Sequence, residues 1–217
     1  MRFYNNVMPW QSWIIQKRAK IILVFKTAYW SLVLVWLVGN WQVYQGSVRW
    51  FEWAILAGES AIVSYILTLL PGMAGRYGVR HPVLQVLTMF RRYIGILTFL
   101  FVLTHLSWVW GVSWVSSVLG GSEIFWPWFL LAGLGAASLL LLMFLTSNDL
   151  AVRKLGPWWK RVHSVTYVIV WLIFLHTSLQ AWNVWSVLIG TAAVMEVGSW
   201  GWVWWKRQKA LNRESIN

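Results

Sequence analysis

Histidine is the side chain in this sequence best suited to hold a metal or a redox cofactor. The chain has four histidines, and two of them, His105 and His176, lie well inside long runs of apolar residues. Ionisable side chains are costly in such surroundings and are therefore usually functional there. The alternative is that each imidazole only satisfies a polar contact inside a helical bundle.

His105 and His176 are expected at matching depths. They follow the starts of their apolar runs, near Tyr93 and Val162, by 12 and 14 residues. At 1.5 Å per helical residue these separations are about 18 and 21 Å. Two helices running in the same direction would bring two neutral imidazoles to one level, as a haem iron with two histidine ligands requires. A zinc or copper shell fits less well, because no third histidine, cysteine or carboxylate lies at that depth on these helices.

A second haem has fewer candidate ligands. His163 precedes His176 by 13 residues, which on a straight helix places the two side chains about 140° apart. Fourteen residues before His105, where a helix returns to nearly the same face, the sequence has Arg91. His163 is therefore a candidate ligand without a histidine partner on that helix, and His81 is expected in a solvated loop. One haem is predicted, with a second left open.

Four charged residues could assist such a site. Arg91 and Arg92 could pair with haem propionates or with lipid phosphates. Glu59 and Glu196 are acids in otherwise apolar runs, where they could accept protons or bind a quinone. They could equally be structural, each paired with a Ser, Tyr or Lys of another helix.

The composition predicts that these residues sit in a membrane. Hydrophobic residues make up 59% of the 217 residues and charged residues only 11%, whereas soluble domains have about 25% charged residues. Six apolar runs have about the length that a helix needs to cross a bilayer. They are Lys20–Val38, Phe51–Leu70, Tyr93–Trp114, Phe125–Thr146, Val162–Trp182 and Val184–Trp205. The predicted fold is all-α, a polytopic bundle of six transmembrane helices.

The basic residues predict the orientation, because short cytoplasmic loops are enriched in Lys and Arg. Nearly all basic loop residues fall on one side of the membrane in the six-helix arrangement, and the other side has only Arg49. The basic side carries both termini, so both termini are predicted to be cytoplasmic. This clustering accounts for the net charge of +12 and argues against nucleic-acid binding. The clustered residues are Lys17, Arg18, Lys20, Arg76, Arg80, Arg91, Arg92, Arg153, Lys154, Lys160, Arg161, Lys206, Arg207 and Lys209.

The chain is expected to form one membrane domain. A cytoplasmic segment, residues 1–19, would precede the helical domain, residues 20–205, and a basic cytoplasmic tail, residues 206–217, would follow it. The first ten residues are too polar for a signal peptide. The absence of cysteine excludes disulfides, thiolate metal sites and catalytic thiols.

Three stretches resemble the ferric-reductase-like transmembrane domain family, in particular its MsrQ group, the haem-binding membrane subunits of periplasmic methionine sulfoxide reductase systems. The first stretch, Arg91–Trp108, has RR-x-x-G ahead of a histidine. The second, Leu145–Gln180, has an LT-S…RKLG-x-W loop and then H-x12-H. The third, Gly58–Gly72, is similar more weakly. Together they cover about half of the chain.

The resemblance implies haem b with ligands at His105, His163 and His176, in the bacterial cytoplasmic membrane. It implies electron transfer from a cytoplasmic-side donor, a flavin reductase or quinol, outward to a periplasmic reductase or another acceptor. FMN or a quinone could also bind. Larger members of this family carry a flavin and nicotinamide domain after the last helix, and only 12 residues follow Trp205 here. The expected activity is therefore that of an oxidoreductase subunit with no catalytic domain of its own.

Two other function classes remain open. The chain could be the membrane subunit of a ferric or oxygen reductase that works with a separate flavoprotein. It could also be a haem-free transporter or scaffold, although the inverted repeats and broken helices typical of transporters are not evident in the sequence.

Overall fold

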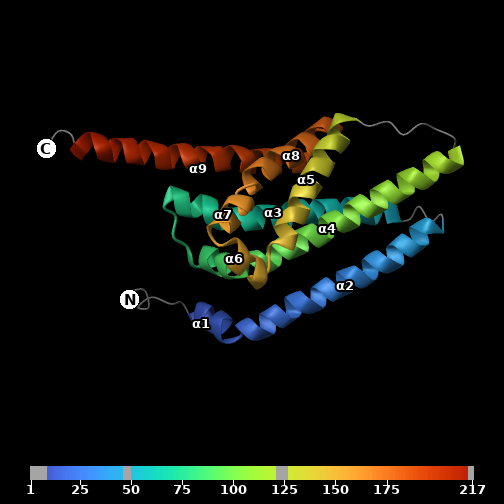
Figure 1. The fold of residues 1–217 in the computed structure, drawn as a ribbon, viewed down its shortest axis with the longest axis horizontal. Coiled ribbons are helices and arrows are strands. Elements are labelled where there is room, and N and C mark those ends of the chain that lie inside the picture. The colour runs from blue at the N-terminus through green and yellow to red at the C-terminus, as the bar shows by residue number, and fades with distance from the viewer. Residues whose placement is uncertain (1–8, 46–49, 121–126, 215–217) are drawn as a thin grey trace. The chain divides into compact units, whose positions relative to one another are not determined.

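The computed structural model describes residues 9–45, 50–120 and 127–214, and these residues form helices joined by short turns. Six segments within them are long and apolar enough to cross a membrane, so the predicted all-α fold with six candidate spans is confirmed. The helices, shown in Figure 1, are α1 (Pro9–Gln16), α2 (Arg18–Tyr44), α3 (Trp50–Tyr77), α4 (Pro82–Gly120), α5 (Trp128–Leu145), α6 (Asp149–Leu155), α7 (Pro157–His163), α8 (Thr166–Gln180) and α9 (Val184–Glu214).

Several helices extend well beyond the apolar runs. Helix α3 continues through Pro71 to Tyr77, and α4 begins at Pro82 rather than near Tyr93. The prediction that Arg76, Arg91 and Arg92 lie in a loop is therefore wrong, because all three are helical. The predicted spans leave out Arg76, Arg91 and Arg92 because these residues are charged, whereas helical backbone hydrogen bonding continues through them. The predicted start of the fourth span at Phe125 and the loop residue Arg49 lie outside the described residues.

His81 starts α4 as a capping residue. Its backbone carbonyl accepts the N–H of Leu84 at 3.0 Å, and its Nδ1 accepts the N–H of Val83 at 3.3 Å. Pro82 suits the first helical position, where its missing N–H would have had no helical partner. The side chain of His81 is exposed, in agreement with the prediction that it is solvated.

The predicted fifth span is two helices rather than one. Helix α7 ends at His163 and α8 begins at Thr166. Across the junction the backbone makes the tighter three-residue bonds, from Val165 N to Val162 O at 3.2 Å and from Tyr167 N to Ser164 O at 3.1 Å. The angle calculated for His163 and His176 on a straight helix therefore does not apply.

The described residues divide into two compact units. The first unit consists of the described residues within 1–64 and 81–125, and the second unit of those within 65–80 and 126–217. In the first unit α2 packs against α4, and the core includes Val43, Ala54 and Trp108. In the second unit α5 packs against α8, and α8 packs against α9 (Figure 1).

Apolar side chains cover much of the exposed surface of the candidate spans. On α2, Val24, Trp30 and Leu34 are each more than 60% exposed. Such a surface is unfavourable in water and suits contact with lipid chains. The chain is therefore a multi-pass membrane protein.

Candidate functional site

His105 lies on α4 in the first unit, where a backbone carbonyl determines which of its nitrogens carries the proton. Its Nδ1 lies 2.8 Å from the carbonyl oxygen of Ala54 on α3. A carbonyl oxygen can only accept, so Nδ1–H is the donor. The neutral ring then has its lone pair on Nε2, which is the nitrogen that would bind a metal ion.

His176 has the same arrangement in the second unit. It lies on α8, and its Nδ1 is 2.8 Å from the carbonyl oxygen of Phe129 on α5. The same reasoning places the proton on Nδ1 and the lone pair on Nε2. Each unit therefore presents one half-buried imidazole in the tautomer that coordinates a metal through Nε2.

These two histidines have the donor chemistry of a haem site. A haem iron with two histidine ligands takes one neutral imidazole on each face, and each ligand commonly donates its other N–H to a carbonyl, carboxylate or water. His105 and His176 satisfy this requirement separately, one in each unit. Within the described residues, no three His, Asp or Glu side chains gather as a metal-binding cluster. The residues present therefore fit a haem.

His163, the third predicted ligand, makes a side-chain contact through Nε2, whereas His105 and His176 contact carbonyls through Nδ1. Its Nε2 lies 3.1 Å from the hydroxyl oxygen of Thr146, and its ring stacks on Trp159 with the centroids 4.1 Å apart. The indole N–H of Trp159 also donates to the Thr146 carbonyl, at 3.0 Å. Ligation through Nε2 would require His163 to give up its contact with Thr146. The assignment of His163 as a ligand stays a prediction.

Arg91 and Arg92 are exposed in the N-terminal half of α4. Arg91 precedes His105 by 14 residues on the same helix, a separation of about 21 Å along the axis. Of the two partners predicted for these arginines, lipid phosphates suit their exposure better than the propionates of a haem at His105.

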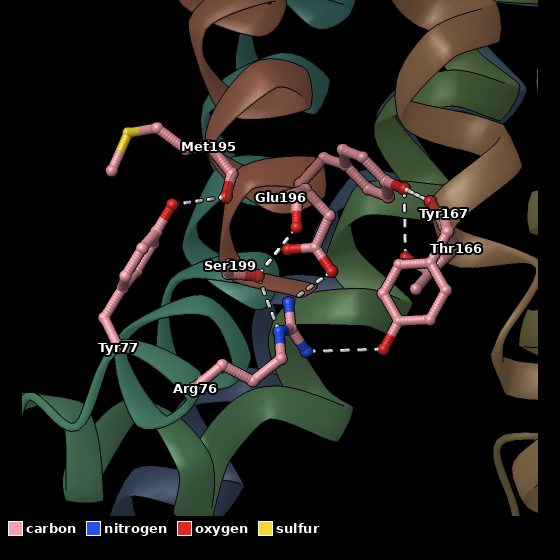
Figure 2. Close-up of polar contacts among 8 residues, drawn as sticks. Arg76, Tyr77, Thr166, Tyr167, Met195, Glu196 and Ser199 are labelled. Carbon is pink, nitrogen blue, oxygen red and sulfur yellow. Dashed lines mark hydrogen bonds and ion pairs between the residues drawn. The ribbon is translucent and has the colours of Figure 1, made fainter. Parts of the chain in front are cut away.

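Glu196 is buried in an ionic network on α9 that the sequence did not predict in full (Figure 2). The Glu196 side chain is 3% exposed and forms an ion pair with Arg76 of α3. The guanidinium also donates to the Ser199 hydroxyl at 2.6 Å, and lies over the Trp200 ring at 4.9 Å. A Ser, Tyr or Lys partner was expected for Glu196. The ionic partner is instead Arg76, one of the basic residues that predict the cytoplasmic side.

Tyrosines of α3 and α8 extend this network. Tyr167 of α8 accepts a long hydrogen bond of 3.4 Å from Arg76, and Tyr77 of α3 donates to the Met195 carbonyl at 3.1 Å (Figure 2). Tyr65, nearer the middle of α3, donates to the carbonyl of Thr166 at 2.7 Å. The end of α3 is thereby joined to α8 and α9 by polar contacts. Glu59, the other predicted acid, is half-buried on α3.

Two curated proteins illustrate what the chain is similar to. The magnetosome protein MamZ of Magnetospirillum gryphiswaldense is 34% identical over 171 residues, which are 73% of this chain and 25% of MamZ. The protein-methionine-sulfoxide reductase heme-binding subunit MsrQ of Salmonella paratyphi B is 30% identical over 139 residues, 61% of this chain and 62% of MsrQ. The chain thus spans a quarter of MamZ and less than two thirds of MsrQ. No solved structure matches it significantly.

A family model extends over the helices that carry the candidate site. The model described as the ferric reductase like transmembrane component matches residues 57–175, more than half of the chain. The match includes His105 and His163 and ends one residue before His176. Together with the similarity to MsrQ, it confirms the resemblance drawn from the sequence motifs. The chain belongs to the family of ferric reductase-like transmembrane components.

Proposed function

We propose that this protein transfers electrons across the bacterial cytoplasmic membrane through a haem b whose axial ligands are His105 and His176. The observation that carries the proposal is the shared tautomer of these two imidazoles, because each donates its Nδ1–H to a backbone carbonyl. The similarity to MsrQ, a protein named as a heme-binding subunit, supports the choice of cofactor.

The protein's own contribution would be to hold and insulate the cofactor. Bound haem supplies a centre that accepts and releases one electron at a time. His105 and His176 would hold it through Nε2, and the carbonyls of Ala54 and Phe129 would keep each ring from rotating. The apolar helices around both histidines would exclude water, which is one way in which a protein adjusts a haem potential.

The direction of transfer follows from the predicted orientation. A flavin reductase or quinol would donate on the cytoplasmic side, where the basic clusters are predicted, and a periplasmic reductase or another acceptor would receive the electrons outside. A ferric or oxygen reductase activity with a separate flavoprotein is the competing assignment. Rates at which the reduced protein is reoxidised by ferric citrate, by oxygen and by a periplasmic reductase would separate the two.

The first test is an optical spectrum of the purified protein, oxidised and then reduced with dithionite, with a pyridine haemochrome count. We expect a low-spin b-type spectrum and about one haem per chain, because one pair of imidazoles supplies two axial ligands. A protein that is folded but free of haem after expression with haem supplied would overturn the proposal. That result would favour the transporter or scaffold class.

His163 tests the number of haems. We expect His163→Ala to keep the haem count and the reduced spectrum of the unmodified protein, because His163 contacts Thr146 through Nε2. Thr146→Val is the matched variant for the loss of this contact, since it removes the hydroxyl that His163 contacts and retains the side-chain shape. A haem count that falls from about two to one in His163→Ala would instead make His163 a ligand of a second haem.

A further inference from the structure

A glycine lies against each of the two candidate ligand rings. Gly58 on α3 faces His105, and Gly133 on α5 faces His176. A Cβ atom placed on Gly58 would lie 2.8 Å from His105 Nδ1, and one placed on Gly133 would lie 2.6 Å from His176 Nδ1. Real Cβ atoms essentially never make contacts shorter than 3.0 Å. Any other residue at either position would therefore displace the ring.

Each glycine is placed one helical turn after the carbonyl that holds the same ring. Gly58 follows Ala54 by four residues, and Gly133 follows Phe129 by four residues. Positions four residues apart lie one above the other on a helix face. An imidazole that donates to the carbonyl of the first residue thus lies over the backbone of the second, where a side chain would otherwise project.

The contacts indicate that these glycines accommodate the rings rather than close helix packing in general. At both positions the three nearest atoms to an added Cβ all belong to the imidazole. Other glycines on the same helices differ. An added Cβ on Gly75 of α3 would have nothing within 4 Å, and one on Gly135 of α5 would make an ordinary contact with Leu172 at 3.5 Å.

We propose that Gly58 and Gly133 are positioning residues for the axial ligands of the haem. Each glycine lets an imidazole lie on the neighbouring helix with Nδ1–H on a carbonyl and Nε2 directed away as the ligating nitrogen. The proposal rests on the function proposed above, because it takes His105 and His176 as the ligands. The same device, a carbonyl followed four residues later by glycine, occurs separately in the two units.

The test compares Gly58→Ala and Gly133→Ala with the matched controls Gly75→Ala and Gly135→Ala in the full chain. Haem affinity and the low-spin electron paramagnetic resonance signal, which reports the orientation of the axial imidazoles, are measured for each variant. We expect Gly58→Ala and Gly133→Ala to weaken haem binding about 10- to 100-fold, the usual effect of disturbing the groups that orient a metal ligand. Both should also shift the resonance signal, whereas the controls should match the unmodified protein. Site variants that behave like their controls would overturn the proposal.

A second measurement needs no haem. Unfolding of the haem-free protein is followed for Gly58→Ala in the unmodified chain and in a His105→Ala background. We expect the added methyl group to lower the melting temperature only where the imidazole is present, because removing the ring leaves room for it. An equal effect in both backgrounds would show that Gly58 serves helix packing and would overturn the positioning role. Absence of haem from the unmodified protein, with the steric coupling intact, would reject the proposed function alone.

Discussion

His105→Ala and His176→Ala are each expected to abolish the low-spin haem spectrum while the protein stays in the membrane. The loss of an axial imidazole removes a bond to the iron, so haem affinity should fall by more than the roughly 100-fold that disturbing a ligand's hydrogen-bond partner can cost. Membrane insertion should persist, because it depends on the hydropathy of the spans and not on one side chain. Haem per chain and the reduced spectrum are measured on protein purified from membranes.

Two variants make this result specific. His81→Ala is the matched histidine control, since His81 is exposed and only caps α4, and it should retain full haem. His105→Met should retain haem with a raised midpoint potential, because a methionine and histidine pair raises the potential of a haem. A structural role for His105 would not predict such a shift. An unchanged spectrum in His105→Ala would reject the ligand assignment.

Breaking the buried ion pair between Arg76 and Glu196 is expected to produce the largest loss of stability. Arg76→Met or Glu196→Leu would leave the remaining charged side chain in a site where Glu196 is only 3% exposed. Removing one partner of a buried pair typically costs about 3–5 kcal/mol, because the other charge loses its compensation. Reversible unfolding in mixed micelles, followed by tryptophan fluorescence, measures the free energy of unfolding.

The double variant Arg76→Met with Glu196→Leu separates the cost of an unpaired charge from the net value of the pair. We expect it to be much more stable than the sum of the single variants predicts, since replacing both ions with apolar side chains is often neutral. Tyr77→Phe is a control that removes a more exposed bond between the same two helices, and it should cost about 1 kcal/mol. Single variants that cost no more than Tyr77→Phe would contradict the expectation.

The helical architecture could be predicted from the sequence because the bilayer imposes it. A chain in lipid must satisfy its backbone hydrogen bonds internally, so each long apolar run becomes a helix. The six runs correspond to the six candidate spans. Helix ends were less predictable. Helix α4 starts at Pro82, ahead of Arg91 and Arg92, and α9 continues to Glu214, because a helix can include charged residues at the edge of an apolar run.

What the sequence determined by itself is the number of apolar spans, the family and the histidines inside those spans, since hydropathy and motifs are properties of residues close together in the chain. Only the tertiary structure decided which atoms these residues contact. Ala54 lies 51 residues from His105, Phe129 lies 47 from His176, and Glu196 lies 120 from Arg76. A hydrogen-bond partner on another helix depends on how the helices pack and rotate, and neither hydropathy nor helical spacing specifies that.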